Sequence, residues 1–212
     1  TMWDTPLNIP VEQIPENYRF TTDRQYYSQA QTVIFHLPTL INELENDLDK
    51  PEGQIWVAWT LECEENYPFF KDPEFMELFD YRISYHQTAD VIQSYLHDNF
   101  IPLMKQPVDT KERANNICML ISSPINQSSR QEYLKELMRE IPIDSYGKLF
   151  NNKKMDQDNG RESKINLYKQ YKFVIAFENA CATDYVTEKF FDPLIAGAVP
   201  IYLGAPNINE FA

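Results

Sequence analysis

The run Tyr171-Lys-Phe-Val-Ile-Ala-Phe-Glu-Asn179, together with Asp184-Tyr-Val-Thr-Glu-Lys189 shortly after it, is the most informative part of this sequence. Residues 173–177 form an apolar segment of strand length, which is typical of a strand buried on both faces. The segment ends at two polar residues and a loop of small residues, and helical spacing begins near Asp184. This pattern predicts a strand, a turn and a helix, with polar and charged groups concentrated at the turn.

A turn of this kind is suited to binding a phosphate. In an open parallel sheet, ligands bind beyond the carboxyl ends of the strands. A helix N-terminus at that position offers free N–H groups and the positive end of the helix dipole. We therefore interpret the turn as a site for a nucleoside diphosphate, and we expect the other elements to bring a second substrate to it.

The composition indicates a folded chain and limits its partners. The 212 residues suffice for one large domain or two small ones, and 43% of them are hydrophobic. A net charge of −13 disfavours nucleic acid as the main partner and docking on an anionic membrane, because both need a basic surface. An anionic nucleotide would need a few locally concentrated cations. We find no signal peptide and no apolar run long enough to be a transmembrane segment.

The residues that build thiol or metal chemistry are scattered. Cys63, Cys118 and Cys181 form no CxxC pair and no disulfide framework. Cys118 lies in an apolar run and is interpreted as a core residue, and a nucleophilic role for Cys63 or Cys181 is the less favoured alternative. The three histidines lack zinc-ligand spacing, and neither a P-loop nor a Gly-x-Gly-x-x-Gly turn occurs. We expect no metal or cofactor to be required.

The first half of the chain predicts alternating strands and helices. Prolines in residues 1–30 predict mostly irregular structure, with a short strand at residues 18–24. Apolar runs bounded by turn residues predict buried strands, and leucine spacing predicts a helix. The strands are expected at residues 32–37, 55–59 and 79–85, and the helix at residues 39–49. This order favours a parallel α/β sheet.

The second half repeats the α/β pattern after a charged linker at residues 104–116. Ser128 with Gln131, or Ser129 with Glu132, predicts a capping box at the start of a helix. The other expectations are buried strands at residues 117–121 and 198–203 and a mobile polar loop at residues 151–164. We therefore predict two α/β domains, residues 1–106 and 107–212, with a ligand cleft between them.

Two cations occur at predicted strand-to-helix turns. Lys189 lies early in its helix, where the dipole disfavours a cation unless an anionic ligand binds there. Its neighbour Glu188 can accept hydrogen bonds from sugar hydroxyls. Arg130 begins another helix, and its guanidinium can fork onto phosphate oxygens. Each alone fits an ordinary solvated side chain, but two turns that each carry a cation favour the phosphate interpretation.

A carboxylate at the end of the strand at residues 55–59 is a candidate general base. Glu62 could take the proton of an attacking sugar hydroxyl, and nearby aromatic residues would raise its pKa. Glu64 and Glu65 are rivals that the chemistry alone does not exclude. His36 also follows a strand, and a structural role for it is favoured over a place in the acceptor pocket.

The sequence resembles the α-1,3/4-fucosyltransferases, glycosyltransferase family 10. The most specific likeness lies in residues 171–179, in residues 184–189 and in Ala196-Gly-Ala-Val-Pro-Ile-Tyr-Leu-Gly204. Upstream, the likeness includes Thr21-Thr-Asp-Arg24, Val33-Ile-Phe-His36, and residues 56–62, 122–130 and 144–147, so that it covers most of residues 20–212.

The resemblance implies a GT-B fold, in which two Rossmann-like domains with parallel sheets face a cleft. It implies fucose transfer from GDP-fucose, with inversion, to a glycan hydroxyl, usually the 3-hydroxyl of N-acetylglucosamine. Carried over by position, Glu62 matches the general base, which selects it over Glu64 and Glu65. The matching donor-site residues are Arg130 and Lys189 on the diphosphate, Glu188 on the ribose, and Asn179 and Tyr185 in the pocket.

The sequence also departs from the family pattern. Many animal members have cysteines near residues 122–130, and this chain has none there. That absence and the acidic composition favour a bacterial, cytoplasmic protein, either free or associated with a membrane, over one of the Golgi lumen. The family normally continues past Ala212, so we expect an incomplete donor domain. The alternatives are a GT-B transferase that uses another nucleotide sugar, and a truncated, non-catalytic nucleotide- or carbohydrate-binding domain.

Overall fold

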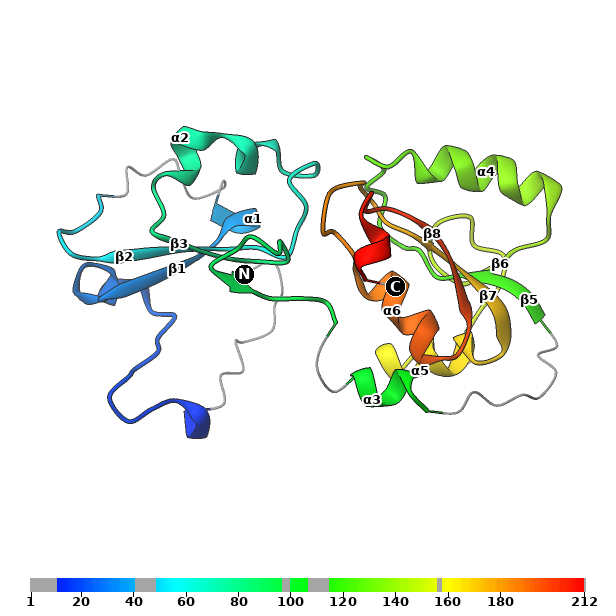
Figure 1. Ribbon diagram of the computed structural model, residues 1–212, viewed down its shortest axis with the longest axis horizontal. Coiled ribbons are helices and arrows are strands. Elements are labelled where there is room, and N and C mark those ends of the chain that lie inside the picture. The colour runs from blue at the N-terminus through cyan, green and yellow to red at the C-terminus, as the bar shows by residue number, and fades with distance from the viewer. Residues whose placement is uncertain (1–10, 41–48, 97–99, 107–114, 156–157, 212) are drawn as a thin grey trace.

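Two parallel sheets organise the molecule (Figure 1). The computed structural model describes residues 11–40, 49–96, 100–106, 115–155 and 158–211. The N-terminal sheet has the order β1-β2-β3-β4, with β1 at Thr32–His36, β2 at Ile55–Trp59, β3 at Tyr81–Ser84 and β4 at Val91–Ile92. The C-terminal sheet has the order β6-β5-β7-β8, with β5 at Asn115–Met119, β6 at Asp144–Ser145, β7 at Tyr171–Phe177 and β8 at Val199–Leu203.

Every neighbouring pair of these strands is parallel, which confirms the predicted α/β class. The helices are α1 (Leu37–Leu40), α2 (Pro73–Met76), α3 (Phe100–Met104), α4 (Arg130–Glu140), α5 (Arg161–Tyr168) and α6 (Glu188–Ile195). Short 3-10 helices lie at Val11–Gln13, Arg24–Gln29, Pro68–Lys71 and Ile208–Glu210.

The C-terminal sheet is covered on both faces, as parallel sheets usually are. Helix α4 packs on one face, where Leu134 meets Met119 and Ile175. Helices α5 and α6 lie on the other side (Figure 1), where Leu167 packs with Val174. The carboxyl ends of β5 and β7 therefore emerge between layers of helices, and the turns that follow them are held in place.

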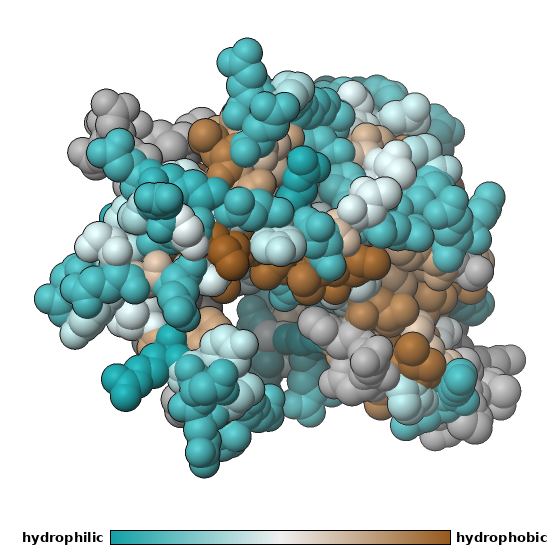
Figure 2. Space-filling model, turned by 60° about the vertical axis from the view of Figure 1, so that its left-hand side comes forward, coloured by the Kyte–Doolittle hydropathy of each residue, from teal (hydrophilic) through white to brown (hydrophobic). Residues whose placement is uncertain are grey.

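The N-terminal sheet buries one face more completely than the other. Phe35 of β1 and Trp56 of β2 pack with Phe79 in one aromatic cluster. On the opposite face, Ile34 is 46% exposed and Tyr81 is 50% exposed. The prediction of buried strands is thus wrong for this second face. Figure 2, which turns this half forward, shows a hydrophobic band crossing the surface.

Several predicted elements differ from the structure. No strand forms at residues 18–24, because the Asp23 carboxylate accepts the Gln25 N–H (3.0 Å) and caps a 3-10 helix instead. Of the helix predicted at residues 39–49, the structure describes α1, and residues 41–48 lie outside the described part. The predicted loop at residues 151–164 ends earlier than expected, because α5 begins at Arg161.

The predicted capping box does not form. Ser129 occupies the N-cap of α4 with a φ of 55°, and its side chain makes no capping hydrogen bond. The side chain of Asn126 replaces it: Oδ1 accepts the Gln131 N–H at 2.9 Å, and Nδ2 donates to Glu132 at 2.8 Å. Asparagine is as effective as serine in supplying this acceptor.

The predicted linker at residues 104–116 is described only at its ends, because residues 107–114 lie outside the described part. Helix α3 precedes it yet packs against the C-terminal half, with the Arg161 guanidinium 3.6 Å from the centre of the Phe100 ring. The division into domains at residues 106 and 107 remains a prediction.

Candidate functional site

The turn between β7 and α6 is longer than the sequence predicts, because the helix begins later. Helix α6 begins at Glu188, and Thr187 is its N-cap, with a side chain that accepts the Lys189 N–H. The prediction that the helix begins near Asp184 is wrong. Asp184 has a φ of 66°, and its backbone N–H donates to the side chain of Asn207 at 2.9 Å, so it belongs to a loop.

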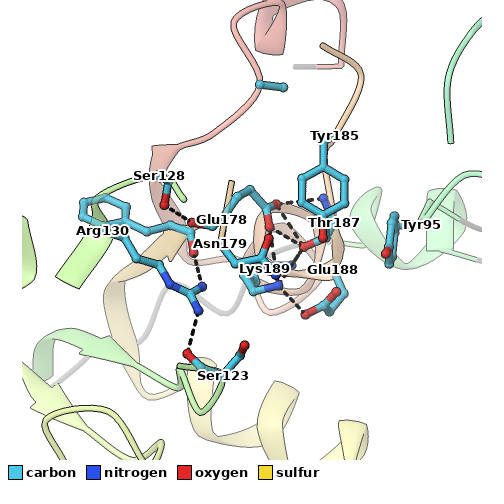
Figure 3. A network of polar contacts seen from close by, with 12 residues as sticks. Tyr95, Ser123, Ser128, Arg130, Glu178, Asn179, Tyr185, Thr187, Glu188 and Lys189 are labelled. Atoms are coloured by element: carbon cyan, nitrogen blue, oxygen red, sulfur yellow. Dashed lines mark hydrogen bonds and ion pairs between the residues drawn. The ribbon is translucent and has the colours of Figure 1, made fainter. Parts of the chain in front are cut away.

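Glu178, the first residue after β7, is the centre of this turn (Figure 3). Its side chain is fully buried and accepts hydrogen bonds from the Thr187 N–H (2.8 Å) and the Thr187 hydroxyl (2.8 Å). The ammonium group of Lys189 lies 3.4 Å from Glu178 Oε2, the oxygen that accepts the 2.8 Å hydrogen bond from the Thr187 hydroxyl. Burial raises the pKa of Glu178, and the Lys189 charge opposes that rise. Sequence reasoning missed Glu178, although it lies just after the end of a strand, as Glu62 does.

Lys189 and Glu188 form a charged cluster with Glu178. The Lys189 ammonium is 3.2 Å from a Glu188 oxygen and 3.1 Å from the Thr187 hydroxyl. Burial lowers the pKa of Lys189, but Glu178 and Glu188 outweigh it and raise the value. For Glu188, burial raises the pKa, but Lys189 and Lys164 outweigh it and lower the value. Because the pair is joined to a fully buried carboxylate, it is more than an ordinary solvated Glu–Lys pair.

A second set of ion pairs connects Glu188 to helix α5 and to Asp192. The Lys164 ammonium lies 3.8 Å from Glu188 and 2.9 Å from Asp192, whose side chain is fully buried. Asp192 also accepts from Arg161 at 2.5 and 2.9 Å. These residues bind α5 to α6. Sequence reasoning missed them because they are far apart in the chain and meet only when the helices pack.

Arg130 is fully buried where α4 begins. Its Nη1 donates to the carbonyl of Phe177 at 3.1 Å and its Nη2 to the carbonyl of Ser123 at 2.8 Å, while Nε has no hydrogen-bond partner among the described residues. Burial lowers its pKa, and Glu178 opposes that shift. The guanidinium therefore joins the carboxyl ends of β5 and β7 and places a positive charge beneath the turn.

Asn179 and Tyr185 belong to the same turn and face the N-terminal half. The Asn179 side chain accepts a hydrogen bond from Asn66 at 3.2 Å. Tyr185 is 2% exposed, and its ring centre lies 5.1 Å from that of Tyr85 and 6.2 Å from that of Tyr95. The loop that follows β7 is thus packed against residues that follow β2 and β3.

Glu62 lies across this interface from α6. Burial raises its pKa, Lys189 opposes the rise and Glu188 adds to it, so the three charges share one site. Its backbone N–H donates to the hydroxyl of Thr60 at 2.9 Å. Among the described residues, no hydrogen bond or ion pair reaches the Glu62 carboxylate. Burial raises the pKa of Tyr67, and the Glu62 charge adds to that rise. This carboxylate remains available to a ligand.

The rival carboxylates, Glu64 and Glu65, are paired with other residues. Burial opposes ionisation of Glu64, but hydrogen bonds from His86 and Tyr85 outweigh it and lower its pKa to about 2. Glu65 pairs with Lys71 at 2.6 Å on the surface. A carboxylate with so low a pKa is a weak base, and one that is exposed and paired lacks the desolvation that would strengthen it.

The remaining candidates fit structural roles. Burial raises the pKa of Cys63 to about 11 and raises that of Cys118 further, so both remain thiols near neutral pH. His36 hydrogen-bonds to the hydroxyl of Thr39 at 3.1 Å. Within the described residues, no group of three or more His, Cys, Asp or Glu side chains is placed to hold a metal ion.

All six predicted site residues therefore surround one turn. Arg130, Asn179, Tyr185, Glu188 and Lys189 come from the C-terminal half, and Glu62 reaches the site from the N-terminal half. Residues 110–212 match the C-terminal part of glycosyltransferase family 10 (fucosyltransferase), and residues 6–96 match the N-terminal fucosyltransferase domain. The chain belongs to glycosyltransferase family 10.

Individual relatives are named fucosyltransferases, in agreement with this assignment. The chain is 30% identical over 211 residues to α-(1,3)-fucosyltransferase B of Drosophila melanogaster, covering 91% of this chain and 47% of that protein. It is 35% identical over 213 residues to the GDP-fucose protein O-fucosyltransferase 3 of Gallus gallus, covering 91% of this chain and 44% of that protein. The chain thus spans about half the length of the curated relatives it matches.

A solved structure shows the same fold. The crystal structure of an α1,3-fucosyltransferase with GDP-fucose superposes with a TM-score of 0.56 and 23% identity, over 76% of this chain and 56% of that chain. The predicted GT-B arrangement of two α/β halves is thereby confirmed. No helix in the described ranges is long and apolar enough to cross a bilayer. The cellular compartment stays a prediction, and the relatives named above are animal proteins.

Proposed function

We propose that this family 10 chain transfers fucose from GDP-fucose to an acceptor hydroxyl, with Glu62 as general base and inversion at the anomeric carbon. One observation carries the proposal. The Glu62 carboxylate has no partner among the described residues, has a raised pKa, and faces the Lys189 and Glu188 charges of the opposite half. A base on one side and a cation on the other is the arrangement that a single displacement needs.

In the proposed reaction, the acceptor oxygen attacks the anomeric carbon of fucose from the face opposite the diphosphate. The bond from that carbon to the diphosphate oxygen breaks, and GDP leaves with the electron pair. Glu62 takes the acceptor proton as the new glycosidic bond forms. Its raised pKa increases its basicity, because a base is most effective when its pKa approaches the working pH.

We assign the donor site to the turn after β7. Lys189 and the first N–H groups of α6 would face the diphosphate, where negative charge increases as GDP leaves. Arg130 is fully buried, so it would contribute through the potential of its charge at this turn. Glu188 would accept hydrogen bonds from the ribose hydroxyls, and Asn179 and Tyr185 would shape the pocket. The proposal requires no metal or other cofactor.

Two acceptors are candidates. The 3-hydroxyl of N-acetylglucosamine on a glycan is the first, consistent with a relative named an α-(1,3)-fucosyltransferase. The second is a serine or threonine hydroxyl on a protein, because relatives from chicken and human are named GDP-fucose protein O-fucosyltransferase 3. Both hydroxyls are deprotonated in the same way by a carboxylate, so the base assignment is common to both.

One transfer assay tests the proposal. The chain is incubated with GDP-fucose, GDP-mannose or a UDP-sugar, with either an N-acetylglucosamine-terminated glycan or a serine- and threonine-containing folded protein domain, and products are detected by mass. We expect transfer from GDP-fucose alone, with the β-linked donor giving an α-linked product. Transfer from another nucleotide sugar would contradict the donor assignment. GDP binding in calorimetry without any transfer would favour the non-catalytic alternative.

A further inference from the structure

The loop after β7 is held by the opposite half of the molecule through Asp184. The Asp184 carboxylate accepts hydrogen bonds from the Gln87 backbone N–H (3.0 Å), the Gln87 side-chain amide (3.1 Å) and the Asn207 side-chain amide (2.9 Å). Its side chain is 8% exposed, and its φ is 66°. A non-glycine residue keeps this conformation only where surrounding contacts fix it.

His86 links the same carboxylate to the N-terminal half. Its Nε2 lies 3.3 Å from Glu64 Oε2, and its Nδ1 lies 3.5 Å from Asp184 Oδ2. A neutral imidazole donates from one ring nitrogen only, whereas the imidazolium donates from both. His86 can therefore donate to both carboxylates at once only when it is protonated. The ring also lies against Tyr85, with centres 4.4 Å apart, and the Tyr85 hydroxyl donates to Glu64.

This ion-pair chain runs beside the predicted donor pocket. Tyr85 and Cys63 of the N-terminal half pack with Ala182 and Tyr185 of the loop. Asn179, at the other end of the loop, accepts a hydrogen bond from Asn66 of the N-terminal half. The loop that carries two predicted donor-site residues is thus positioned by residues outside its own domain.

We propose that His86 is a positioning residue: as an imidazolium it joins Glu64 to Asp184 and holds the loop at residues 179–185 against the N-terminal half. The consequence for donor binding rests on the proposed function, because it requires Asn179 and Tyr185 to contact the nucleotide. The positioning of the loop itself does not require that function. We call Glu64, His86 and Asp184 the clamp.

The groups around His86 fix the direction of its pH dependence. The titratable groups that face it are Glu64 and Tyr85 on one side and Asp184 on the other, with Cys63 beside Tyr85 and Glu210 on Gln87. The Glu64 hydrogen bond raises the pKa of His86, burial opposes it, and Asp184 adds to the rise. The clamp is therefore fully formed below the ordinary histidine pKa and is lost as pH rises through the raised value.

Hydrogen exchange of the backbone amides at residues 180–187, without ligand, measures the clamp directly. The variants are His86→Gln and Asp184→Asn; asparagine tolerates a positive φ, so the second removes the charge with little backbone strain. Lys71→Gln is the control, because it breaks an exposed ion pair with Glu65 that does not cross between the halves. At about pH 6, we expect protection factors to fall about fivefold in both variants and to stay unchanged in the control.

Protection factors already correct for the intrinsic pH dependence of exchange, so the wild-type chain provides a second test. Its protection at residues 180–187 should fall about fivefold between about pH 6 and pH 8, whereas the His86→Gln protection should stay level. This series needs no variant and decides the question even if His86→Gln does not fold. Wild-type protection that is constant over this range, or equal to that of His86→Gln at pH 6, would overturn the clamp.

Calorimetry with GDP then tests the link to donor binding. At about pH 6, the dissociation constant for GDP should rise about fivefold in His86→Gln, and the difference from wild type should vanish near pH 8. Unchanged GDP affinity in a variant whose loop protection has fallen would refute the link. If the wild-type chain binds no GDP, the proposed function fails, and the exchange experiment still decides whether His86 positions the loop.

Discussion

The Glu178 carboxylate, fully buried at the end of β7, lies 3.4 Å from the ammonium group of Lys189 in the first turn of α6. A lysine is normally disfavoured at a helix N-terminus, because the helix dipole is positive there. Glu178 supplies the missing counter-charge from within the fold. The ion pair ties the end of β7 to the start of α6. It also offsets part of the positive charge that Lys189 brings to the first turn of the helix.

Replacing Glu178 by glutamine should destabilise the protein. Glutamine keeps a hydrogen-bond acceptor for Thr187, but among the described residues it leaves Glu188 as the only carboxylate within ion-pair distance of Lys189. We expect the free energy of unfolding in urea to fall by about 2 kcal/mol, below the range for fully buried pairs because Lys189 is partly exposed. The control Glu136→Gln removes an exposed pair with Arg139 and should cost far less. Equal losses in the two variants would contradict this prediction.

Replacing Asp192 should lower the stability of the protein more than its place in the sequence suggests. Its buried carboxylate is the shared partner of Arg161 and Lys164. Asp192→Asn removes the charge that both cations face, and we expect the free energy of unfolding to fall by about 3 kcal/mol. Denaturant titration measures the loss, with Glu140→Gln on the exposed side of α4 as a control. A change no larger than the control's would show that the two cations find other partners.

Glu64 should make the stability depend on acid pH. Its pKa is lowered from the ordinary 4.5 to about 2, so the folded state releases the proton more readily than the unfolded state. The stabilisation is therefore complete above pH 4.5 and is lost as pH falls towards 2. The stability difference between wild type and Glu64→Gln should shrink by about 2 kcal/mol between pH 6 and pH 3 in urea titrations. Glu65→Gln is the control for the loss of a carboxylate from the same loop.

The strands were the most predictable part of the fold. The runs at Ile55–Trp59 and Tyr171–Phe177 are mostly apolar and contain β-branched residues, and these local properties suffice to predict a strand in a parallel sheet. The start of α6 is predicted too early, because the helical spacing in the sequence begins near Asp184. The Asp184 carboxylate instead binds Gln87 and Asn207, and no local rule encodes partners so distant in the sequence.

In the candidate site too, some residues have a local signal in the sequence and others do not. Glu62, Glu188 and Lys189 were found because each carries a charge at the end of a predicted strand or the start of a helix. Glu178 was overlooked, since its role depends on burial against Lys189 rather than on its position in the chain. The Glu64–His86–Asp184 contacts link residues from two halves of the chain. Glu64 and His86 meet within the N-terminal half, but only the packing of the two halves brings Asp184 to them, so the sequence carries no local signal for this contact.

Gly147 should tolerate no side chain. An added Cβ would lie 2.5 Å from the carbonyl carbon of Ile121 and would also overlap its backbone nitrogen and oxygen, which cannot move without distorting β5 and its turn. We expect Gly147→Ala to lower the free energy of unfolding by about 3 kcal/mol. Gly160→Ala is the matched control: Gly160 has a φ of 70° but open space around its Cβ position, so only backbone strain of about 1 kcal/mol is expected. The reverse order of the two variants in thermal or urea unfolding would contradict the steric explanation.

Glu62→Gln should separate turnover from nucleotide binding. Glutamine has nearly the same shape but cannot take a proton, so the proposed displacement loses its base. We expect fucose transfer to fall by at least about a hundredfold, while the affinity for GDP changes little, because the assigned nucleotide contacts lie on the other half. Glu65→Gln is the control and should retain transfer. The two quantities are measured on the same preparations, transfer by product mass and GDP binding by calorimetry. Retained transfer in Glu62→Gln would refute the base assignment. A loss of GDP affinity in parallel with the loss of transfer would indicate that Glu62 binds the nucleotide instead of accepting the proton.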